Sequence, residues 1–179
     1  MSNDVYTDPL VSRYTSLRMQ ELFSADTRFR TWKKCWIELA KGQRALGLTD
    51  IISQDAIDDL VAHANDIDYE TAAAKEKELR HDVMAHVYAY GHQAKKAAGI
   101  IHLGATSQYV VCNTDLILHR QALGFVKEDL VAAIAALAQT VERLKDTPAL
   151  GATHFQAAQP TTMGKRLSLA LQDLLMDLD

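Results

Sequence analysis

The chain has 179 residues, enough for one domain or for one domain and part of another. Hydrophobic residues make up 48% and charged residues 23%, as in soluble globular proteins, and a net charge of -4 argues against nucleic-acid binding. The sequence has no apolar run long enough for a transmembrane helix, and Met1–Asp4 lacks the features of a signal peptide. The two distant cysteines, Cys35 and Cys112, are predicted to be free thiols in a reducing compartment, so we expect a cytoplasmic protein.

The first part of the chain predicts an irregular arm followed by short helices. Residues 1 to about 23 form the arm, which includes a polar cluster around Arg13 and Tyr14. A helix is predicted for residues 26–46, because its aromatic residues recur at helical spacing and Gly47 follows its end. Three further helices are predicted to begin at polar caps, which are Ser53, Asp68 and Asp82.

The second part of the chain predicts long helices. Leucine recurs every seven residues, which predicts a helix over residues 113–145, roughly 50 Å long, of the kind found in bundles. These leucines are Leu116, Leu123, Leu130, Leu137 and Leu144. A last helix is predicted to begin at Pro160 and to continue up to Asp179, where the apolar pattern stops without a cap. We therefore expect an all-α fold, with a helical domain over residues 1–112, the start of a bundle over residues 113–179, and a longer parent protein.

Three polar junctions between these helices could carry chemistry. At the first, Arg80 and His81 could bind an anion at a helix N-terminus, or Asp82 could simply cap the helix while the other two are solvated. At the second, the loop of residues 104–107 could hold a carboxylate or phosphate with its amides and with Thr106 and Ser107, or could be a plain turn.

The third junction, residues 151–166, is predicted to be a polar turn between two helices. His154 within it could pass a proton to or from a ligand, or it could be a structural histidine. Metal binding is disfavoured, because His81 and His86 are five residues apart and do not share a helix face, and neither cysteine has a histidine at ligand spacing.

At these junctions the sequence closely resembles the adenylosuccinate lyase family of the fumarase/aspartase superfamily. The resemblance covers nearly the whole chain. Its longest segments are specific enough to distinguish this family from the related fumarases and argininosuccinate lyases. The segments that carry it are residues 12–14, 29–32, 80–87, 96–107, 113–116 and 153–166.

The resemblance implies an enzyme that eliminates fumarate from adenylosuccinate to give AMP, and from the succinylated carboxamide ribotide SAICAR to give AICAR, without a cofactor. It implies that His154 is the general acid and that Arg13 and Tyr14 bind the nucleotide. It also implies that Arg80, His81 and Asp82 line the substrate site, that Thr106 and Ser107 bind the succinyl part, and that Thr153 is a weaker candidate.

The family's catalytic base is a serine on a loop that these 179 residues lack, and the resemblance implies a homotetramer whose active sites combine three subunits. The chain alone is therefore expected to be inactive. Val111 and Cys112 stand where relatives usually carry an acidic residue. The polar network that follows Ser107 in the family is therefore expected to differ in this chain. Two alternatives stay open, namely a non-catalytic helical oligomerisation module and another lyase of the superfamily, such as argininosuccinate lyase.

Overall fold

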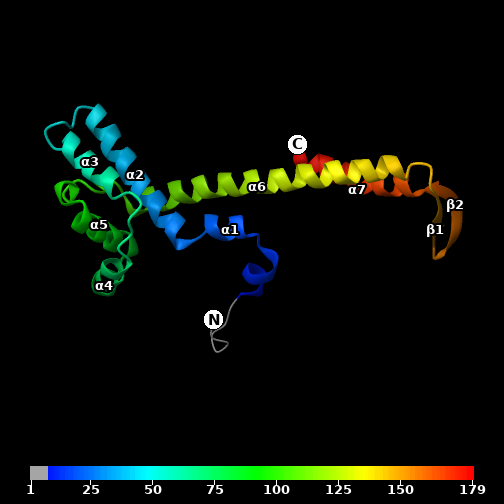
Figure 1. Cartoon of the computed structure of the whole chain (residues 1–179), viewed down its shortest axis with the longest axis horizontal. Coiled ribbons are helices and arrows are strands. Elements are labelled where there is room, and N and C mark those ends of the chain that lie inside the picture. Colours follow the sequence, from blue (N-terminus) through cyan, green and yellow to red (C-terminus); the bar gives the residue numbers. More distant parts are fainter. Residues whose placement is uncertain (1–7) are drawn as a thin grey trace. The chain divides into compact units, whose positions relative to one another are not determined.

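The computed structural model describes residues 8–179, which divide into two compact units between Gln121 and Ala122 (Figure 1). The chain is mostly helical, which confirms the predicted fold class in its main feature. The division lies within one long helix, α6 (Ser107–Arg143). The predicted domain boundary after residue 112 lies within the same helix and stays a prediction. None of the helices between residues 8 and 179 is long and apolar enough to span a membrane.

The first unit consists of the helices that precede α6 and of the first part of α6. The preceding helices are η1 (Leu10–Tyr14), α1 (Leu17–Leu22), α2 (Ala25–Ala45), α3 (Gln54–Ala62), α4 (Tyr69–Leu79), α5 (Asp82–Gln93) and η2 (Lys95–Ala97). The arm predicted to be irregular therefore carries η1 and α1 in its described part, and residues 1–7 lie outside it. The prediction missed both helices because each is too short to show a periodic apolar face.

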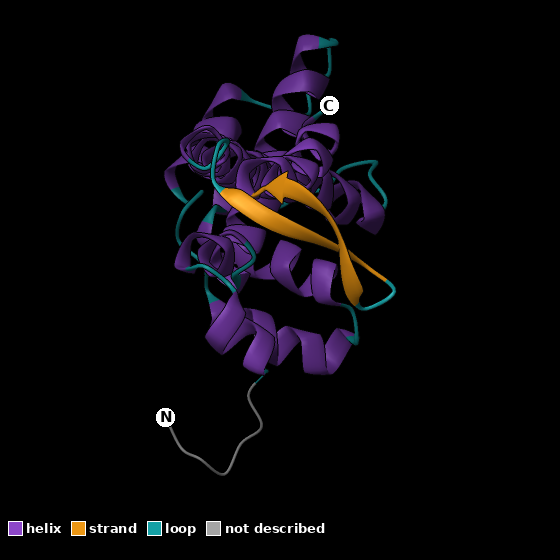
Figure 2. Cartoon of the chain, turned by 90° about the vertical axis from the view of Figure 1, so that its right-hand side faces the viewer, coloured by secondary structure: helices purple, strands orange, loops and turns teal. Residues whose placement is uncertain are grey.

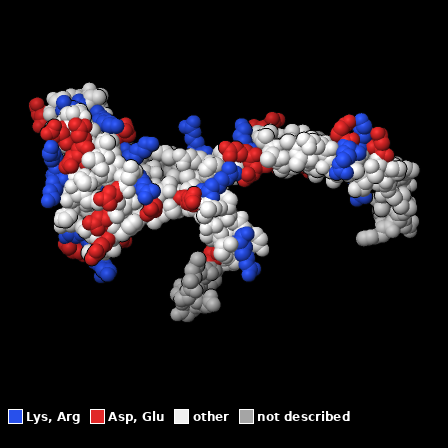
Figure 3. All heavy atoms as spheres, viewed as in Figure 1, with Lys and Arg blue, Asp and Glu red and all other residues white. Residues whose placement is uncertain are grey.

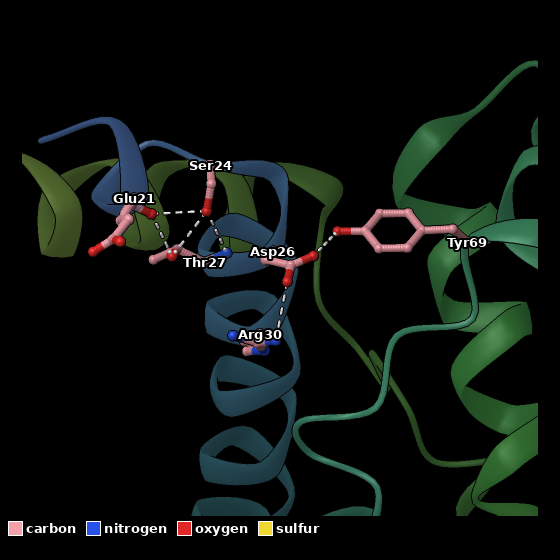
Figure 4. A network of polar contacts seen from close by, with 6 residues as sticks. All are labelled: Glu21, Ser24, Asp26, Thr27, Arg30 and Tyr69. Carbon is pink, nitrogen blue, oxygen red and sulfur yellow. Dashed lines mark hydrogen bonds and ion pairs between the residues drawn. The ribbon is translucent and has the colours of Figure 1, made fainter. Parts of the chain in front are cut away.

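Helix α2 begins in a network of polar side chains (Figure 4). Ser24 accepts a hydrogen bond from the backbone N–H of Thr27 at 3.2 Å, which caps the helix. Asp26 pairs with Arg30 at 3.0 Å and accepts a 2.5 Å bond from the hydroxyl of Tyr69, which stands at the start of α4. The predicted caps Ser53 and Asp68 are also observed. These bonds set where α2, α3 and α4 begin.

The core of the first unit is built on the aromatic face of α2. Trp32 and Trp36 are fully buried, and Tyr90 of α5 packs beside Trp36 and donates a 2.7 Å bond to the carbonyl of Leu60. His86 of α5 is buried and stacks on the ring of Phe29, with ring centroids 3.8 Å apart. The predicted aromatic face therefore forms the centre to which α3 and α5 attach.

A buried lysine ties three segments of this unit together. Lys33, which is 4% exposed, donates hydrogen bonds to the backbone carbonyls of His63 and Asp66 and to the side chain of Gln93. Its ammonium also lies over the ring of Tyr90, 4.1 Å from the centroid. Burial lowers the pKa of Lys33 to about 8, against the opposing effect of the nearby aspartates. The ammonium thus joins α2 to the loop after α3 and to the end of α5.

The long helix α6 begins six residues earlier than predicted, at Ser107, and ends at Arg143. Its first turns belong to the core of the first unit, since Val110, Thr114 and Leu118 are buried. The leucine repeat lies on another face, where Leu116 and Leu123 are each 69% exposed. The predicted start of the helix was placed near the first leucine of the repeat. The first turns are instead buried through side chains that do not belong to the repeat.

The second unit contains a β-hairpin that the all-α prediction did not include (Figure 2). Strand β1 (Pro148–Thr153) pairs antiparallel with β2 (Gln156–Thr162) over the segment that was predicted to be a turn between helices. Pro160 lies in β2, so the prediction that it opens the last helix is wrong. Helix α7 (Met163–Leu178) begins instead after a cap by Thr162. Proline is tolerated here because this is a two-stranded edge.

The hairpin and α7 are attached to the end of α6 through the backbone. The N–H groups of Met163 and Gly164 donate 2.9 Å bonds to the carbonyls of Thr147 and Leu144. A Cβ atom at Gly164 would lie 2.6 Å from the Cα of Lys145, so only glycine permits this approach. From there α7 runs back beside α6 (Figure 1).

The hairpin turns on two residues that both have left-handed backbone conformations. His154 has a φ of 50° and Phe155 a φ of 60°, and they connect the paired residues Thr153 and Gln156. Such a two-residue turn with two positive φ values strongly prefers Asn-Gly, because other side chains are strained there. Phe155 is also fully exposed, so packing within the described chain does not compensate for its backbone strain.

We predict that His86 makes the protein sensitive to acid. Burial lowers the pKa of His86 from 6.5 to about 4, so between these values the unfolded chain binds a proton that the folded chain does not. Stability should therefore fall by about 3 kcal/mol as the pH is lowered through this window. Denaturant titrations at several pH values should show that His86→Phe flattens the loss, whereas the same change at exposed His119 does not. An unchanged slope in His86→Phe would contradict the assignment.

We predict that Phe155 strains the turn. Because Phe155 has a positive φ and an exposed ring, Phe155→Gly should be more stable to denaturant than Phe155→Ala by about 1 kcal/mol. Both variants remove the ring, so their difference isolates the backbone conformation. Equal stability of the two variants would show that the turn is not strained at this residue.

Candidate active site

His81 caps helix α5, a role that the sequence prediction gave to Asp82. The Nδ1 atom of His81 accepts a bond from the backbone N–H of Met84 at 3.3 Å, and His81 itself has an extended backbone. Asp82 is the first residue of the helix, and its carboxylate accepts a 2.7 Å bond from the N–H of Val83. The longer histidine side chain reaches the third N–H of the helix, so Asp82 is left beside the cap.

The same histidine joins two of the predicted junctions. Its Nε2 atom lies 3.1 Å from the hydroxyl oxygen of Ser107. Because Nδ1 accepts the Met84 N–H, the neutral ring carries its proton on Nε2 and donates it to Ser107. The hydroxyl hydrogen of Ser107 is then available to an acceptor such as a carboxylate. His81 thus orients a donor at the start of α6.

The loop before α6 is held by backbone bonds and by α2. Gly104 has a φ of 69°, and the N–H of Ala105 donates to the carbonyl of His102 at 3.1 Å. The side-chain amide of Gln43 donates a 2.8 Å bond to the carbonyl of Leu103. The carbonyl of Thr106 accepts the N–H of Tyr109, which starts the first turn of α6. These bonds place Thr106 and Ser107 together at the helix start.

His102 has a structural partner that the sequence did not reveal. Its Nδ1 atom accepts a 3.0 Å bond from the indole N–H of Trp36, and its φ is 66°. Burial lowers the pKa of His102, and a positive charge on His81, present only when that ring is protonated, acts in the same direction. A neutral His102 is required by this bond, because an imidazolium has no free nitrogen to accept it. His102 therefore anchors the loop to the aromatic core.

Arg80 and the two arm residues are presented to solvent. Arg80 ends α4 in a left-handed conformation, with a φ of 50°, and lines a surface hollow of about 570 Å³ with Lys77 and Glu76. Arg13 and Tyr14 lie on η1, and the ring of Tyr14 is 78% exposed. All three side chains are therefore accessible to a ligand.

The third predicted junction lies in the second unit. Thr153 ends β1 and His154 begins the turn at the hairpin tip, where both are exposed. The pairing of β1 with β2 up to Thr153 and Gln156 places His154 at the tip of the hairpin. Between residues 8 and 179, no three His, Cys, Asp or Glu side chains are grouped so that they could hold a metal ion.

Comparison with known proteins gives consistent matches to lyases. A family model described as "Lyase" matches residues 17–179. An adenylosuccinate lyase of Schizosaccharomyces pombe is 49% identical over 175 residues, covering 97% of this chain and 36% of that protein. An adenylosuccinate lyase of Saccharomyces cerevisiae is 49% identical over 177 residues, covering 98% of this chain and 36% of that protein. The chain thus spans about a third of the length of these relatives.

Solved structures agree with this fold. A 3-carboxy-cis,cis-muconate lactonizing enzyme of Pseudomonas putida matches with a TM-score of 0.83 and 26% identity, covering 94% of this chain and 39% of that chain. A fumarate lyase of Mesorhizobium sp. BNC1 matches with a TM-score of 0.80 and 26% identity, covering 90% and 38%. Because the family model covers most of the sequence, the chain belongs to the lyase family.

Proposed function

We propose that the chain is the N-terminal part of an adenylosuccinate lyase. The parent enzyme eliminates fumarate from adenylosuccinate to give AMP, and from SAICAR to give AICAR, in the cytoplasm. The 49% identity to two fungal adenylosuccinate lyases supports this choice within the lyase family. The observation that carries the mechanism is the position of His154, an exposed imidazole held at the tip of a strained hairpin.

In the proposed reaction, a base from outside these 179 residues removes the proton from the carbon beside a succinyl carboxylate. The electron pair of that C–H bond forms the double bond of fumarate, and the C–N bond breaks. Its electrons stay on the departing nitrogen, which takes a proton from His154. Histidine suits this step because imidazole can hold and release a proton at cellular pH. Thr153, which precedes His154 on β1, is a weaker candidate to contact the ligand.

The substrate carries a phosphate and two carboxylates, so its site needs cations and hydrogen-bond donors. We assign Arg13 and Tyr14 to the nucleotide, since a guanidinium binds phosphate through two parallel bonds. Arg80 and Asp82 line the site on either side of His81. Ser107, oriented by the Nε2–H of His81, is proposed to donate to a succinyl carboxylate together with Thr106.

The long helix supports assembly of the parent as a homotetramer. Leu116 and Leu123 belong to the seven-residue repeat and are each 69% exposed. Figure 3 shows an uncharged stretch of α6 between one charged cluster near the middle of the helix and another near its end. Exposed apolar side chains repeated on one helix face are typical of a seam between helices. We propose that other helices of the assembly cover this face.

His154→Asn in the full-length enzyme should lower kcat for adenylosuccinate by about 10²–10⁴-fold, the typical contribution of a general acid. Asparagine tolerates the left-handed backbone, so the hairpin should be retained while the proton donor is lost. His119→Asn, a histidine change on α6, should leave kcat close to wild type. A His154→Asn enzyme within a few-fold of wild type would exclude this role.

The same assay separates the alternatives. Cleavage of argininosuccinate in preference to adenylosuccinate and SAICAR would identify another lyase of the superfamily. Absence of any turnover by the full-length protein would favour the oligomerisation module.

His81→Asn should separate the cap of α5 from the orientation of Ser107. Asparagine is a good N-cap, so stability should change little, but its short side chain cannot reach Ser107. Loss of one oriented hydrogen bond should raise KM for adenylosuccinate about tenfold. His81→Ala should lose both functions and should also destabilise the protein by about 1 kcal/mol. An unchanged KM in His81→Asn would show that the bond to Ser107 does not serve the substrate.

A further inference from the structure

A second polar hollow lies beside the His154 hairpin, within the second unit. It has a volume of about 350 Å³, near the lower end for ligand pockets, and so suits a small molecule rather than a nucleotide. The strands contribute Leu150, Gln159 and Thr161, and α7 contributes Lys165, Arg166 and Leu169. The hollow therefore combines two cations with an amide, a hydroxyl and an apolar edge.

The two cations lie at the N-terminal end of α7, where the helix dipole is unfavourable for positive charge. Lys165 and Arg166 are in the first turn of α7, which contains no acidic residue, and no carboxylate lines the hollow. The N-terminal end of a helix carries a partial positive charge, which repels cations by about 0.3–1 kcal/mol each. An anion in the hollow would remove this repulsion and would gain from the helix dipole as well.

The backbone N–H groups of this helix end are already occupied. Those of Met163 and Gly164 bind carbonyls of the segment after α6, and that of Lys165 binds the hydroxyl of Thr162 at 3.2 Å. An anion would therefore be held by side chains, through the Lys165 ammonium and the Arg166 guanidinium. Gln159 and Thr161 offer further donors on the hairpin side.

We propose that Lys165 and Arg166, with Gln159 and Thr161, form a binding site for the phosphate or carboxylate group of a small anion. The site lies in the second unit, whereas His81 and Ser107 lie in the first, and it does not depend on the proposed reaction. Its apolar edge at Leu150 and Leu169 can accept a short carbon chain, so a dicarboxylate and inorganic phosphate are the two sources to distinguish.

The test is local labelling of lysines in the full-length protein. The acetylation rate of Lys165 is measured by mass spectrometry with increasing inorganic phosphate or fumarate, at ionic strength held constant with chloride. Protection of Lys165 should be saturable, while Lys127 on α6 should be unaffected. The anion that protects at the lower concentration identifies the preferred class. Arg166→Gln should raise the concentration for half-protection by about tenfold or more.

Arg143→Gln removes one cation from the same unit outside the hollow and should leave the protection unchanged. If Arg143→Gln and Arg166→Gln weakened the protection of Lys165 equally, the protection would come from general charge screening, and the proposed site would be excluded. The proposal also fails if neither anion protects Lys165, or if Lys165 is not labelled even without anions because it is covered. Because the labelling requires no turnover, its failure would leave the proposed elimination untouched.

Discussion

The indole N–H of Trp36 donates a part-buried hydrogen bond to His102, and this bond positions the loop that leads to Ser107. Trp36 lies in the aromatic core of α2, so its position is set by packing. The bond holds His102 in a left-handed turn, from which the chain enters the loop that begins α6. Ser107 then stands at the helix start, within reach of His81 on α5. Hydrophobic packing thus decides where a hydroxyl donor lies.

Backbone strain is concentrated at the positions with chemical interest. Between residues 8 and 179, four non-glycine residues have positive φ values: two are proposed site residues, one adjoins His154, and one precedes the loop that carries Thr106 and Ser107. These are Arg80, His102, His154 and Phe155. A non-glycine residue in this region costs of order 1 kcal/mol, so the surrounding structure must hold it there. The caps, the Trp36 bond and the strand pairing supply that constraint.

The sequence predicted helix caps and apolar helix faces well, because each depends on residues that are close together along the chain. The caps Ser53 and Asp68 and the aromatic face of α2 are observed as expected, because capping and helical periodicity depend on neighbours along the chain. At the start of α5, the local sequence does not decide which residue caps the helix. Asp82 and His81 both offer an acceptor there, and the bond from His81 to Ser107, 26 residues away, favours the histidine as the cap.

By itself the sequence determined a mostly helical fold, the approximate helix positions and the family, since these follow from periodicity and from motifs. Only the tertiary structure decided that residues 148–162 form a hairpin, that Lys33 is a buried clamp and that His81 meets Ser107. The hairpin consists of the pairing between β1 and β2, and the N–H groups of Met163 and Gly164 join its end to the carbonyls of Thr147 and Leu144 just after α6, which no local pattern encodes. Contacts between residues far apart in the sequence depend on how the helices pack, and local sequence patterns do not contain that information.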